Sequence, residues 1–247
     1  MTKDEPTPAT DVATALRAGV GALDWGSLEA SLDSMGVAGA GPLLTGAACQ
    51  ALVDLYANDE AFRSRIVMAR HGFGSGEYKY LAYPLPDSVA ALRAALYPRL
   101  APIANRWFGR MGKDEAFPAD HADFLARCHA AGQTRPTPLL LKYGPGDYNC
   151  LHQDLYGPLA FPIQAMVLLS KPGADFTGGE FVVVEQRPRM QSRAEVVSPG
   201  PGDLVLFAVN ERPVTGTRGD YRVKMRHGVS RIEAEHATLG IIFHDAA

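Results

Sequence analysis

The sequence predicts a mostly β protein, an antiparallel barrel or jelly roll preceded by helices. Two observations carry this prediction. Residues 138–245 hold short apolar runs separated by Gly/Pro turns, with no helical period between them. Stretches whose apolar residues recur at helical spacing lie within residues 10–137. With 247 residues, of which 47% are hydrophobic, the chain is long enough to bury one large core.

This pattern divides the chain into three stretches. Residues 1–9 are polar and rich in Pro and Thr, so we expect them to form a disordered tail. Residues 10–137 are expected to be a helical N-terminal region that supports the outside of the barrel. Residues 138–247 are expected to be the β core, and the two regions together form a single integrated domain.

Helices are expected in three places before the core. The apolar spacing over residues 11–32 suggests two short helices that break near Gly26. Thr45 is the expected N-cap of a helix over residues 46–56, because its hydroxyl can accept a hydrogen bond from a free backbone N–H. A longer helix is expected over residues 87–108, where apolar residues recur every three or four positions.

The core is expected to consist of short strands that alternate with turns. Turn signals occur at Gly144–Asp147, Asp175–Phe181 and Gly200–Asp203. The expected strands cover residues 138–143, 148–152, 161–169, 182–184, 204–207, 221–227 and 237–243.

Residues 70–86 differ from their surroundings in glycine and aromatic content. Their clustered glycines allow sharp backbone turns. Tyr78, Tyr80 and Tyr83 supply flat faces, and Lys79 supplies a charge. Such a combination suits a flipped base, single-stranded nucleic acid or an aromatic small molecule, which makes these four residues candidates for substrate binding. A purely structural β-hairpin is the alternative.

His152 and Asp154 are separated by one residue, and His227 follows much later. On an extended strand, residues i and i+2 point to the same side, so the first two can hold one metal ion while a neighbouring strand supplies His227. Two imidazoles and one carboxylate are the ligand set of non-haem Fe(II) oxygenases. These three residues are therefore the predicted metal ligands and catalytic centre. Cys150 would share the face of His152 if the strand is regular.

Residues 138–245 resemble the double-stranded β-helix of the Fe(II)/2-oxoglutarate dioxygenases. Within them, Tyr143–Asp154 is similar to the tyrosine, Pro-Gly turn and His-x-Asp of the AlkB-type nucleic-acid demethylases. Further segments extend the likeness, over roughly residues 40–247, to an AlkB-like bacterial oxygenase family described as acting on alkylated DNA. These segments are Tyr78–Tyr80, Tyr83–Pro86, Gly179–Phe181, Gln186–Arg189, Arg226–Ser230 and Leu239–Asp245.

The resemblance implies Fe(II) as the metal, 2-oxoglutarate as the co-substrate and O2 as the oxidant. It also implies that 2-oxoglutarate is decarboxylated to succinate while the substrate is hydroxylated or demethylated. In the resembled families a tyrosine at the place of Tyr143 contacts 2-oxoglutarate. An arginine on the last barrel strand, two residues before a Ser or Thr, pairs with the distal carboxylate.

This arginine is replaced here by His236, with Thr238 two residues later. A protonated histidine can pair with a carboxylate, but it lacks the two-pronged guanidinium fork. Arg231 is the alternative cation for the same carboxylate. The sequence therefore names Tyr143, His236, Thr238 and Arg231 as candidate co-substrate residues.

The net charge of −3 argues against a nucleic-acid ligand, but the charge is unevenly distributed. Residues 1–60 hold two basic and nine acidic side chains, so the rest of the chain is net basic. Basic residues gather between 212 and 231, at Arg212, Arg218, Arg222, Lys224, Arg226 and Arg231. These would either meet phosphates beside the metal site or form a solvated strand edge that resists aggregation.

The sequence also indicates a compartment. It contains three cysteines without a paired spacing, which is typical of reduced thiols in the cytoplasm. No apolar run is long enough to span a membrane, and the acidic N-terminus lacks the apolar stretch of a secretory signal. We expect a cytoplasmic protein without membrane contact.

Together these features predict an Fe(II)/2-oxoglutarate-dependent dioxygenase acting on alkylated nucleobases in single- or double-stranded DNA. A hydroxylase of a small-molecule metabolite or an amino-acid side chain is the second interpretation, which the overall acidity favours. A catalytically silent sensor that binds metal or 2-oxoglutarate is the third, suggested by His236 in place of arginine.

Overall fold

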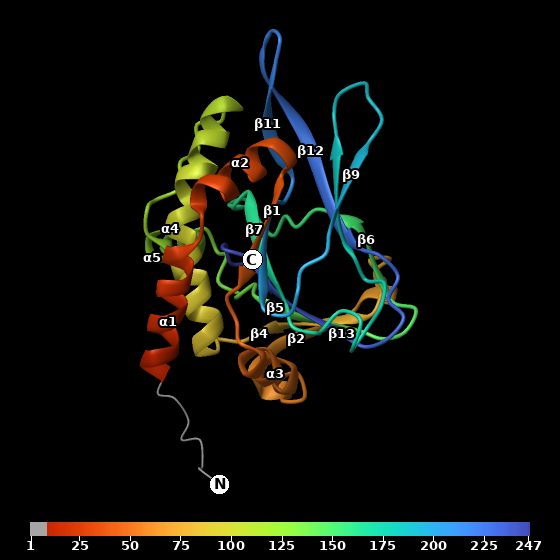
Figure 1. Ribbon diagram of the computed structural model, residues 1–247. Coiled ribbons are helices and arrows are strands. Elements are labelled where there is room, and N and C mark those ends of the chain that lie inside the picture. Colours follow the sequence, from red (N-terminus) through yellow and green to blue (C-terminus); the bar gives the residue numbers. More distant parts are fainter. Residues whose placement is uncertain (1–8) are drawn as a thin grey trace.

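The computed structural model describes residues 9–247, and two antiparallel β-sheets form its centre (Figure 1). The larger sheet has seven strands, in the spatial order β1 (Val37–Pro42), β10 (Asp203–Ala208), β7 (Ile163–Leu168), β13 (His236–Ile241), β5 (Leu139–Tyr143), β4 (Glu77–Leu81) and β2 (Phe62–Val67). The smaller sheet has six, with β3 (Gly74–Ser75), β6 (Tyr148–His152), β12 (Gly219–Val229), β8 (Phe181–Gln186) and β9 (Arg193–Val197) in order and β11 (Glu211–Gly216) paired to β12. This arrangement confirms the predicted fold class, a mostly β jelly roll with flanking helices.

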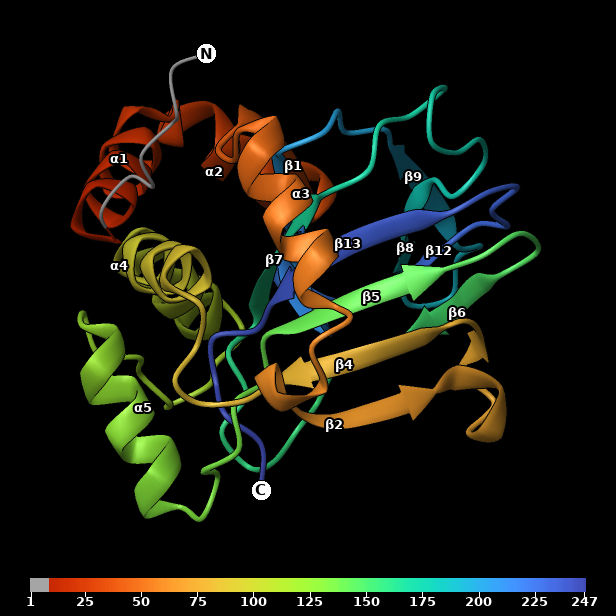
Figure 2. The same ribbon diagram turned by 90° about the horizontal axis from the view of Figure 1, so that it is seen from below.

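The helices lie outside the larger sheet. They are α1 (Ala9–Ala22), α2 (Trp25–Met35), α3 (Gly46–Leu55), α4 (Asp87–Arg110) and α5 (His121–Ala130), with 3-10 turns at η1 (Asp59–Ala61) and η2 (Met68–Arg70). Figure 2 shows α1, α4 and α5 grouped together on one side, while α3 lies apart. Among residues 9–247, no helix combines the length and apolar content needed to cross a membrane.

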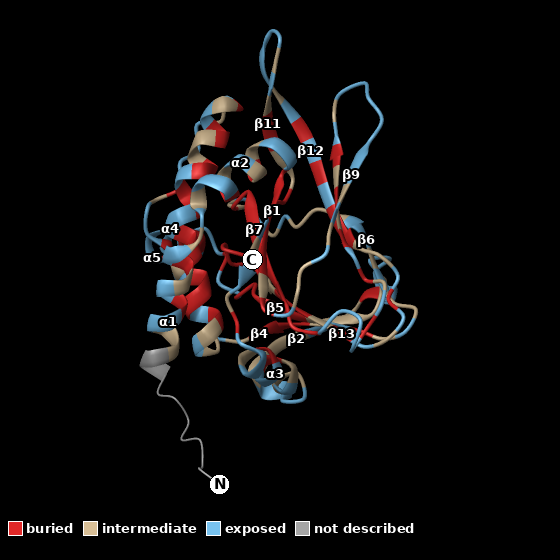
Figure 3. Ribbon diagram, in the orientation of Figure 1, coloured by how far each residue is buried: buried red, intermediate tan, exposed pale blue. Residues whose placement is uncertain are grey.

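Helix α4 shares one hydrophobic core with the larger sheet. Its apolar residues at three- and four-residue steps, including Leu92, Leu96, Leu100 and Trp107, are all buried. Buried positions therefore mark one side of this helix and continue along the strands of the larger sheet (Figure 3). The expected helix over residues 87–108 is confirmed.

The expected helix caps account for where the shorter helices begin. Thr45 accepts a hydrogen bond from the backbone N–H of Ala48 at 3.2 Å, as predicted for the start of α3. The first two helices separate at residues 23–24 rather than at Gly26. Asp24 is the reason, because its carboxylate accepts from the N–H of Ser27 at 3.1 Å and so starts α2.

The description of residues 10–137 as a helical region was incomplete. This region also supplies β1, β2, β3 and β4, which pair with strands of the core, so both regions share the same sheets. The segment 70–86 indeed contains short strands. The predicted disordered tail lies outside the described residues except for Ala9, which begins α1.

A buried ion pair fastens the C-terminal segment to the helices. Asp245 is fully buried, and its carboxylate lies 2.8 Å from the guanidinium of Arg93 on α4. His129 on α5 also contacts this carboxylate, at 2.8 Å, and the hydroxyl of Tyr83 donates to it at 2.9 Å. One carboxylate thus joins both helices to the residues that follow β13.

Candidate active site

A cavity of about 510 Å³ lies between the two sheets. Most of its walls are apolar, with Leu139, Met166 and Leu168 from the larger sheet and Phe181 from the smaller one. The side chains predicted as metal ligands are part of the same wall. A concave, mostly apolar space with a few polar groups is the usual form of a ligand site.

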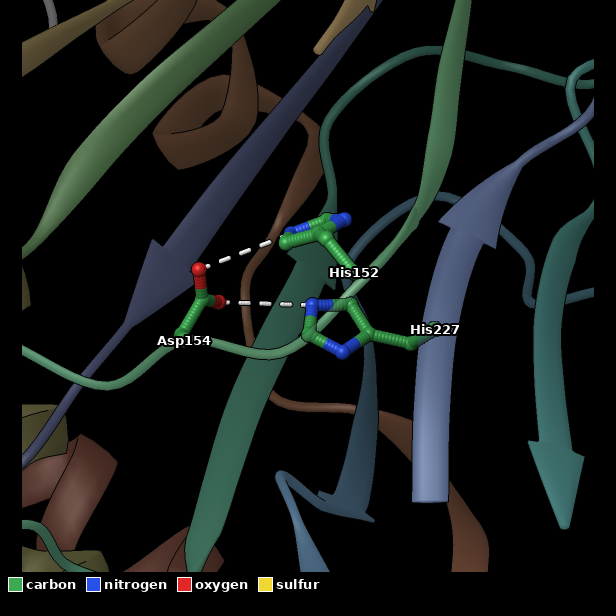
Figure 4. A group of neighbouring side chains, drawn as sticks. All are labelled: His152, Asp154 and His227. Atoms are coloured by element: carbon green, nitrogen blue, oxygen red, sulfur yellow. Dashed lines mark ion pairs between the residues drawn. The ribbon is translucent and has the colours of Figure 1, made fainter. Parts of the chain in front are cut away.

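His152, Asp154 and His227 come together in this cavity (Figure 4). His152 ends β6 and lies opposite His227 in the antiparallel pairing with β12. The Nε2 atom of His152 is 3.5 Å from Asp154 Oδ1, and that of His227 is 3.3 Å from Oδ2. One ligand atom of each residue lies within 4.8 Å of the others, so a single metal ion can reach all three.

The contacts around these residues also fit a metal ion. Nδ1 of His152 donates to the carbonyl oxygen of Cys150 at 2.8 Å, which leaves Nε2 as the ligand atom. The hydroxyl of Tyr156 donates to Asp154 Oδ1 at 2.6 Å and orients the carboxylate. Nδ1 of His227 is buried without a hydrogen-bond partner among the described residues. Its other ring nitrogen, Nε2, faces Asp154 at 3.3 Å and is therefore the atom placed to bind the metal.

The charges of the three residues are coupled. Burial by itself would raise the pKa of Asp154, but hydrogen bonds and charge from His152 and His227 hold this pKa well below its usual range. Burial opposes the charged form of His152, yet the Asp154 carboxylate outweighs it and raises the pKa of that imidazole. Burial lowers the pKa of His227. At neutral pH the site thus presents an ionised carboxylate to a cation.

A β-bulge aims His152 into the cavity. The pairing of β6 with β12 shifts between Asn149↔Val229 and His152↔His227, so two residues of β6 lie opposite Gly228. This extra residue breaks the alternation of faces. Cys150 is therefore exposed and does not share the face of His152, contrary to the expectation for a regular strand.

Gly228 lets the bulge approach β12 closely. A Cβ atom at this position would lie 2.7 Å from the carbonyl oxygen of Asn149. Replacing Gly228 with alanine is therefore expected to displace β6 and weaken Fe(II) affinity about 10- to 100-fold. Titration with Fe(II) measures this, with Gly39→Ala as the control because a Cβ at Gly39 meets nothing within 4 Å. Unchanged affinity in Gly228→Ala would show that the bulge does not aim the ligand.

Three of the four predicted co-substrate residues line the cavity. Tyr143 on β5 and His236 on β13 are paired across the sheet, with 5.5 Å between ring centroids. Thr238 follows on the same face of β13, and all three are buried. The hydroxyl of Tyr143 accepts a hydrogen bond from Asn149 at 3.3 Å.

Arg231, the fourth candidate, is exposed and does not line the cavity. Its guanidinium donates to the carbonyl oxygen of Gly146 at 3.1 Å and lies 5.6 Å from the centre of the Tyr148 ring. These contacts hold it on the loop outside. Among the described residues, no lysine or arginine lines the cavity.

Of the four predicted substrate residues, Tyr78 lines the cavity. Tyr80 packs beside it in a small buried cluster with Leu139. Lys79 points to the other face of β4, where its amine donates to the carbonyl oxygen of Tyr56 at 2.8 Å. Strand alternation accounts for this separation.

Tyr83 also lies outside the cavity, because its hydroxyl belongs to the buried Arg93–Asp245 network. The 70–86 segment contributes a different aromatic ring instead. Phe73 lines the cavity and is 45% exposed, and its ring stacks on His71 with 5.2 Å between centroids. Phe73 thus lies at a solvent-exposed part of the cavity wall.

The predicted basic cluster does not face the metal ligands. Arg212 is buried and forms an ion pair with Glu185. Along β12, the exposed Arg222, Lys224 and Arg226 alternate with buried residues that include His227. The three cations therefore lie on the outer face of the smaller sheet. Of the two interpretations left open for these cations, the alternation excludes a basic face beside the metal site and agrees with solvated side chains on the outside of the strand.

Gln164 is a cavity residue that the sequence reasoning missed. It lies on β7, is 3% exposed, and its amide nitrogen has no hydrogen-bond partner among the described residues. The sequence did contain a sign of this role, because Gln164 is the only polar residue within the apolar run 161–169. A buried polar group of this kind needs a partner, which a ligand in the cavity would supply.

Comparison with known proteins places this site in a family. Residues 76–246 match the family model described as "Oxygenase, catalysing oxidative methylation of damaged DNA". Two Mycobacterium tuberculosis proteins, both described as uncharacterized, are each 50% identical over 165 residues, covering 66% of this chain and 71% of the relative.

Solved structures with the same fold are more distant in sequence. A Pseudomonas putida prolyl-4-hydroxylase superposes with a TM-score of 0.54 at 14% identity, over 90% of this chain and 99% of that one. A Trichoplax adhaerens prolyl hydroxylase, solved with a hypoxia inducible factor peptide, gives 0.53 at 15% identity, over 97% and 94%. These likenesses concern the fold. The family match shows that the chain belongs to this oxygenase family.

Proposed function

We propose that this oxygenase oxidises alkylated nucleobases in DNA, with Fe(II) held by His152, Asp154 and His227. The observation that carries the proposal is the convergence of these three ligands inside an apolar cavity. Bound Fe(II), with 2-oxoglutarate and O2, supplies the oxidation that releases succinate and CO2. Tyr156 keeps the Asp154 carboxylate oriented, and the apolar walls exclude water from the reacting atoms.

We also propose that 2-oxoglutarate extends from the metal ligands toward Tyr143, His236 and Thr238. Their position on adjacent strands of one wall supports this placement. The hydroxyls of Tyr143 and Thr238 can donate to a carboxylate. Burial raises the pKa of Tyr143, so its phenol keeps the proton needed for donation.

Two features support a nucleobase as the substrate. The family description names damaged DNA. A planar base without negative charge suits a cavity without lysine or arginine, and Phe73 and Tyr78 offer rings on which an extruded base can stack. Hydroxylation of an N-methyl carbon leaves a group that departs as formaldehyde and restores the N–H. The chemistry thus supports removal of the alkyl group.

A hydroxylase of a small metabolite or an amino-acid side chain is the second candidate. The net charge of −3 favours it, because an acidic protein does not attract a polyanion. The exposed cations of β12 lie on the other face of their sheet. A silent sensor would bind Fe(II) and 2-oxoglutarate without converting 2-oxoglutarate to succinate, whichever substrate is added.

Succinate release distinguishes these candidates. The Fe(II)-loaded protein is incubated with 2-oxoglutarate and O2, with or without a methylated oligonucleotide, and an unmethylated oligonucleotide of the same sequence is the control. Faster succinate release with the methylated strand alone, together with formaldehyde, supports the proposal. Equal rates with both strands, with stimulation by a small molecule instead, would favour the hydroxylase.

Phe73→Ala tests the proposed stacking surface. Loss of one base–aromatic stack is expected to reduce oligonucleotide-stimulated turnover about 10-fold, because such stacks contribute about 1–3 kcal/mol. Val196→Ala is the control, since Val196 is 62% exposed and does not line the cavity. Fe(II) and 2-oxoglutarate binding are expected to stay unchanged in both variants. Equal turnover of Phe73→Ala and the native protein would exclude stacking on this ring.

A further inference from the structure

The cavity lacks a permanent positive charge that could hold a dicarboxylate. Apart from the proposed metal ligands, His236 is the one basic side chain among the described residues of its wall. A carboxylate taken out of water into an apolar cavity needs a charged or strongly donating partner. The distal carboxylate of 2-oxoglutarate therefore has few possible partners in this wall.

His236 is held in an apolar setting with unused hydrogen-bonding capacity. It is 4% exposed and packs edge-on against Phe176, with 4.4 Å between ring centroids. Its Nδ1 atom is buried and has no partner among the described residues. Burial lowers the pKa of this imidazole to about 4, so the ring is neutral at physiological pH before any ligand enters.

Titratable groups around His236 do not supply a competing charge inside the cavity. Tyr143, its cross-strand neighbour, stays protonated because burial raises its pKa. The wall formed by β7 contributes Leu168, and the loop before β8 contributes Phe176. Charged side chains occur on the far side of β5 and β13, in a second cavity of about 350 Å³ that His236 also borders. These are Asp54, Lys142 and Glu235, with the phenol of Tyr56 beside them.

We propose that His236 binds the distal carboxylate of 2-oxoglutarate and takes up one proton as it does so. This inference rests on the proposed co-substrate site and adds the protonation step to it. The proton comes from solvent, the imidazole becomes an imidazolium, and the carboxylate stays ionised, so charge balances within the pair. Thr238 on the same strand face and Tyr143 across from it supply the neutral donors.

Proton uptake fixes the sign of the pH dependence. The ring is neutral in the free protein and charged in the complex, so its pKa is higher in the complex. Between these two pKa values, 2-oxoglutarate affinity falls about tenfold for each unit of rising pH. An arginine at this position would keep its charge throughout the range and remove the dependence.

Anaerobic calorimetry of the Fe(II)-loaded protein tests the proposal. 2-Oxoglutarate is titrated at about pH 6.5 and about pH 7.5, in two buffers of different ionisation enthalpy at each pH, to count the protons bound. The native protein is expected to take up protons on binding, at most one per site, and to bind more weakly at the higher pH, by up to about tenfold. His236→Arg is expected to bind with little proton uptake and similar affinity at both pH values. His236→Gln is expected to bind weakly, also without uptake.

Fe(II) affinity is measured for each variant first, because an intact metal site shows that the variant has folded. Tight binding to the native protein without proton uptake would overturn the inference while leaving the co-substrate site in place. Proton uptake that persists in His236→Gln would also overturn it, because another group would then carry the proton. Failure of the native protein to bind 2-oxoglutarate at either pH would instead refute the proposed co-substrate site itself.

Discussion

Asp154→Ala is expected to abolish Fe(II) binding at concentrations that saturate the native protein, and succinate formation should fall to background. Asp154 is the only carboxylate of the ligand group, and its low pKa keeps it ionised at neutral pH. Without it, two imidazoles would face a dication with no negative charge. We expect affinity to fall by more than about 100-fold, because even groups that only orient metal ligands contribute about 10- to 100-fold.

Equilibrium dialysis with metal analysis measures this effect, and a coupled assay follows succinate. Glu180→Ala is the matched control. Glu180 is a carboxylate that borders the same cavity, but its hydrogen bond is to Ser230 and it is not one of the ligand group. Native-like Fe(II) affinity in Asp154→Ala, or an equal loss in Glu180→Ala, would contradict the assigned ligand set.

Arg93→Ala is expected to lower the free energy of unfolding by about 3–5 kcal/mol, because it leaves a buried carboxylate without its cation. Both partners are almost inaccessible to water, at 2% and 0% side-chain exposure. Arg93 also donates to the carbonyl oxygen of Ile242 at 2.8 Å, so the variant loses a backbone contact to the end of β13. Chemical denaturation followed by circular dichroism provides the measurement.

Arg110→Ala serves as the control for this experiment. Arg110 lies on the same helix and pairs with Asp220 at 2.7 Å, but both side chains are about a quarter exposed to solvent. Its loss is expected to cost less than about 1 kcal/mol, as for other ion pairs in contact with water. Equal unfolding free energies of the two variants would contradict a major contribution of the Arg93–Asp245 pair to stability.

Sequence periodicity accounts for much of this fold. The 3.6-residue spacing of α4 and the apolar runs of β5, β7 and β10 are found where they were expected. Strands with little apolar content were missed. β1 reads Val-Ala-Gly-Ala-Gly-Pro, and β9 lies at a sheet edge with most of its side chains exposed. Their pairing depends on a partner strand rather than on their own composition.

In the candidate site, too, the features set by neighbouring residues could be predicted from the sequence, and those set by contacts distant in sequence could not. The two-residue spacing of His152 and Asp154 is local, and it correctly brought these two side chains to one place. Lys79 points away from the cavity because neighbouring residues of a strand point to opposite faces, and the sequence alone could have predicted this. The outward position of Arg231 depends on a contact with the loop at Gly146, far away in sequence. Such contacts leave no periodic signal.

The central claim is that His152, Asp154 and His227 hold Fe(II) where 2-oxoglutarate can bind it. Adding Fe(II) and then 2-oxoglutarate to metal-free protein without oxygen, while recording the visible spectrum, tests this most directly. We expect a weak charge-transfer band that needs both components and is absent from His152→Ala. Fe(II) binding without this band, or a band that persists in His152→Ala, would contradict the claim.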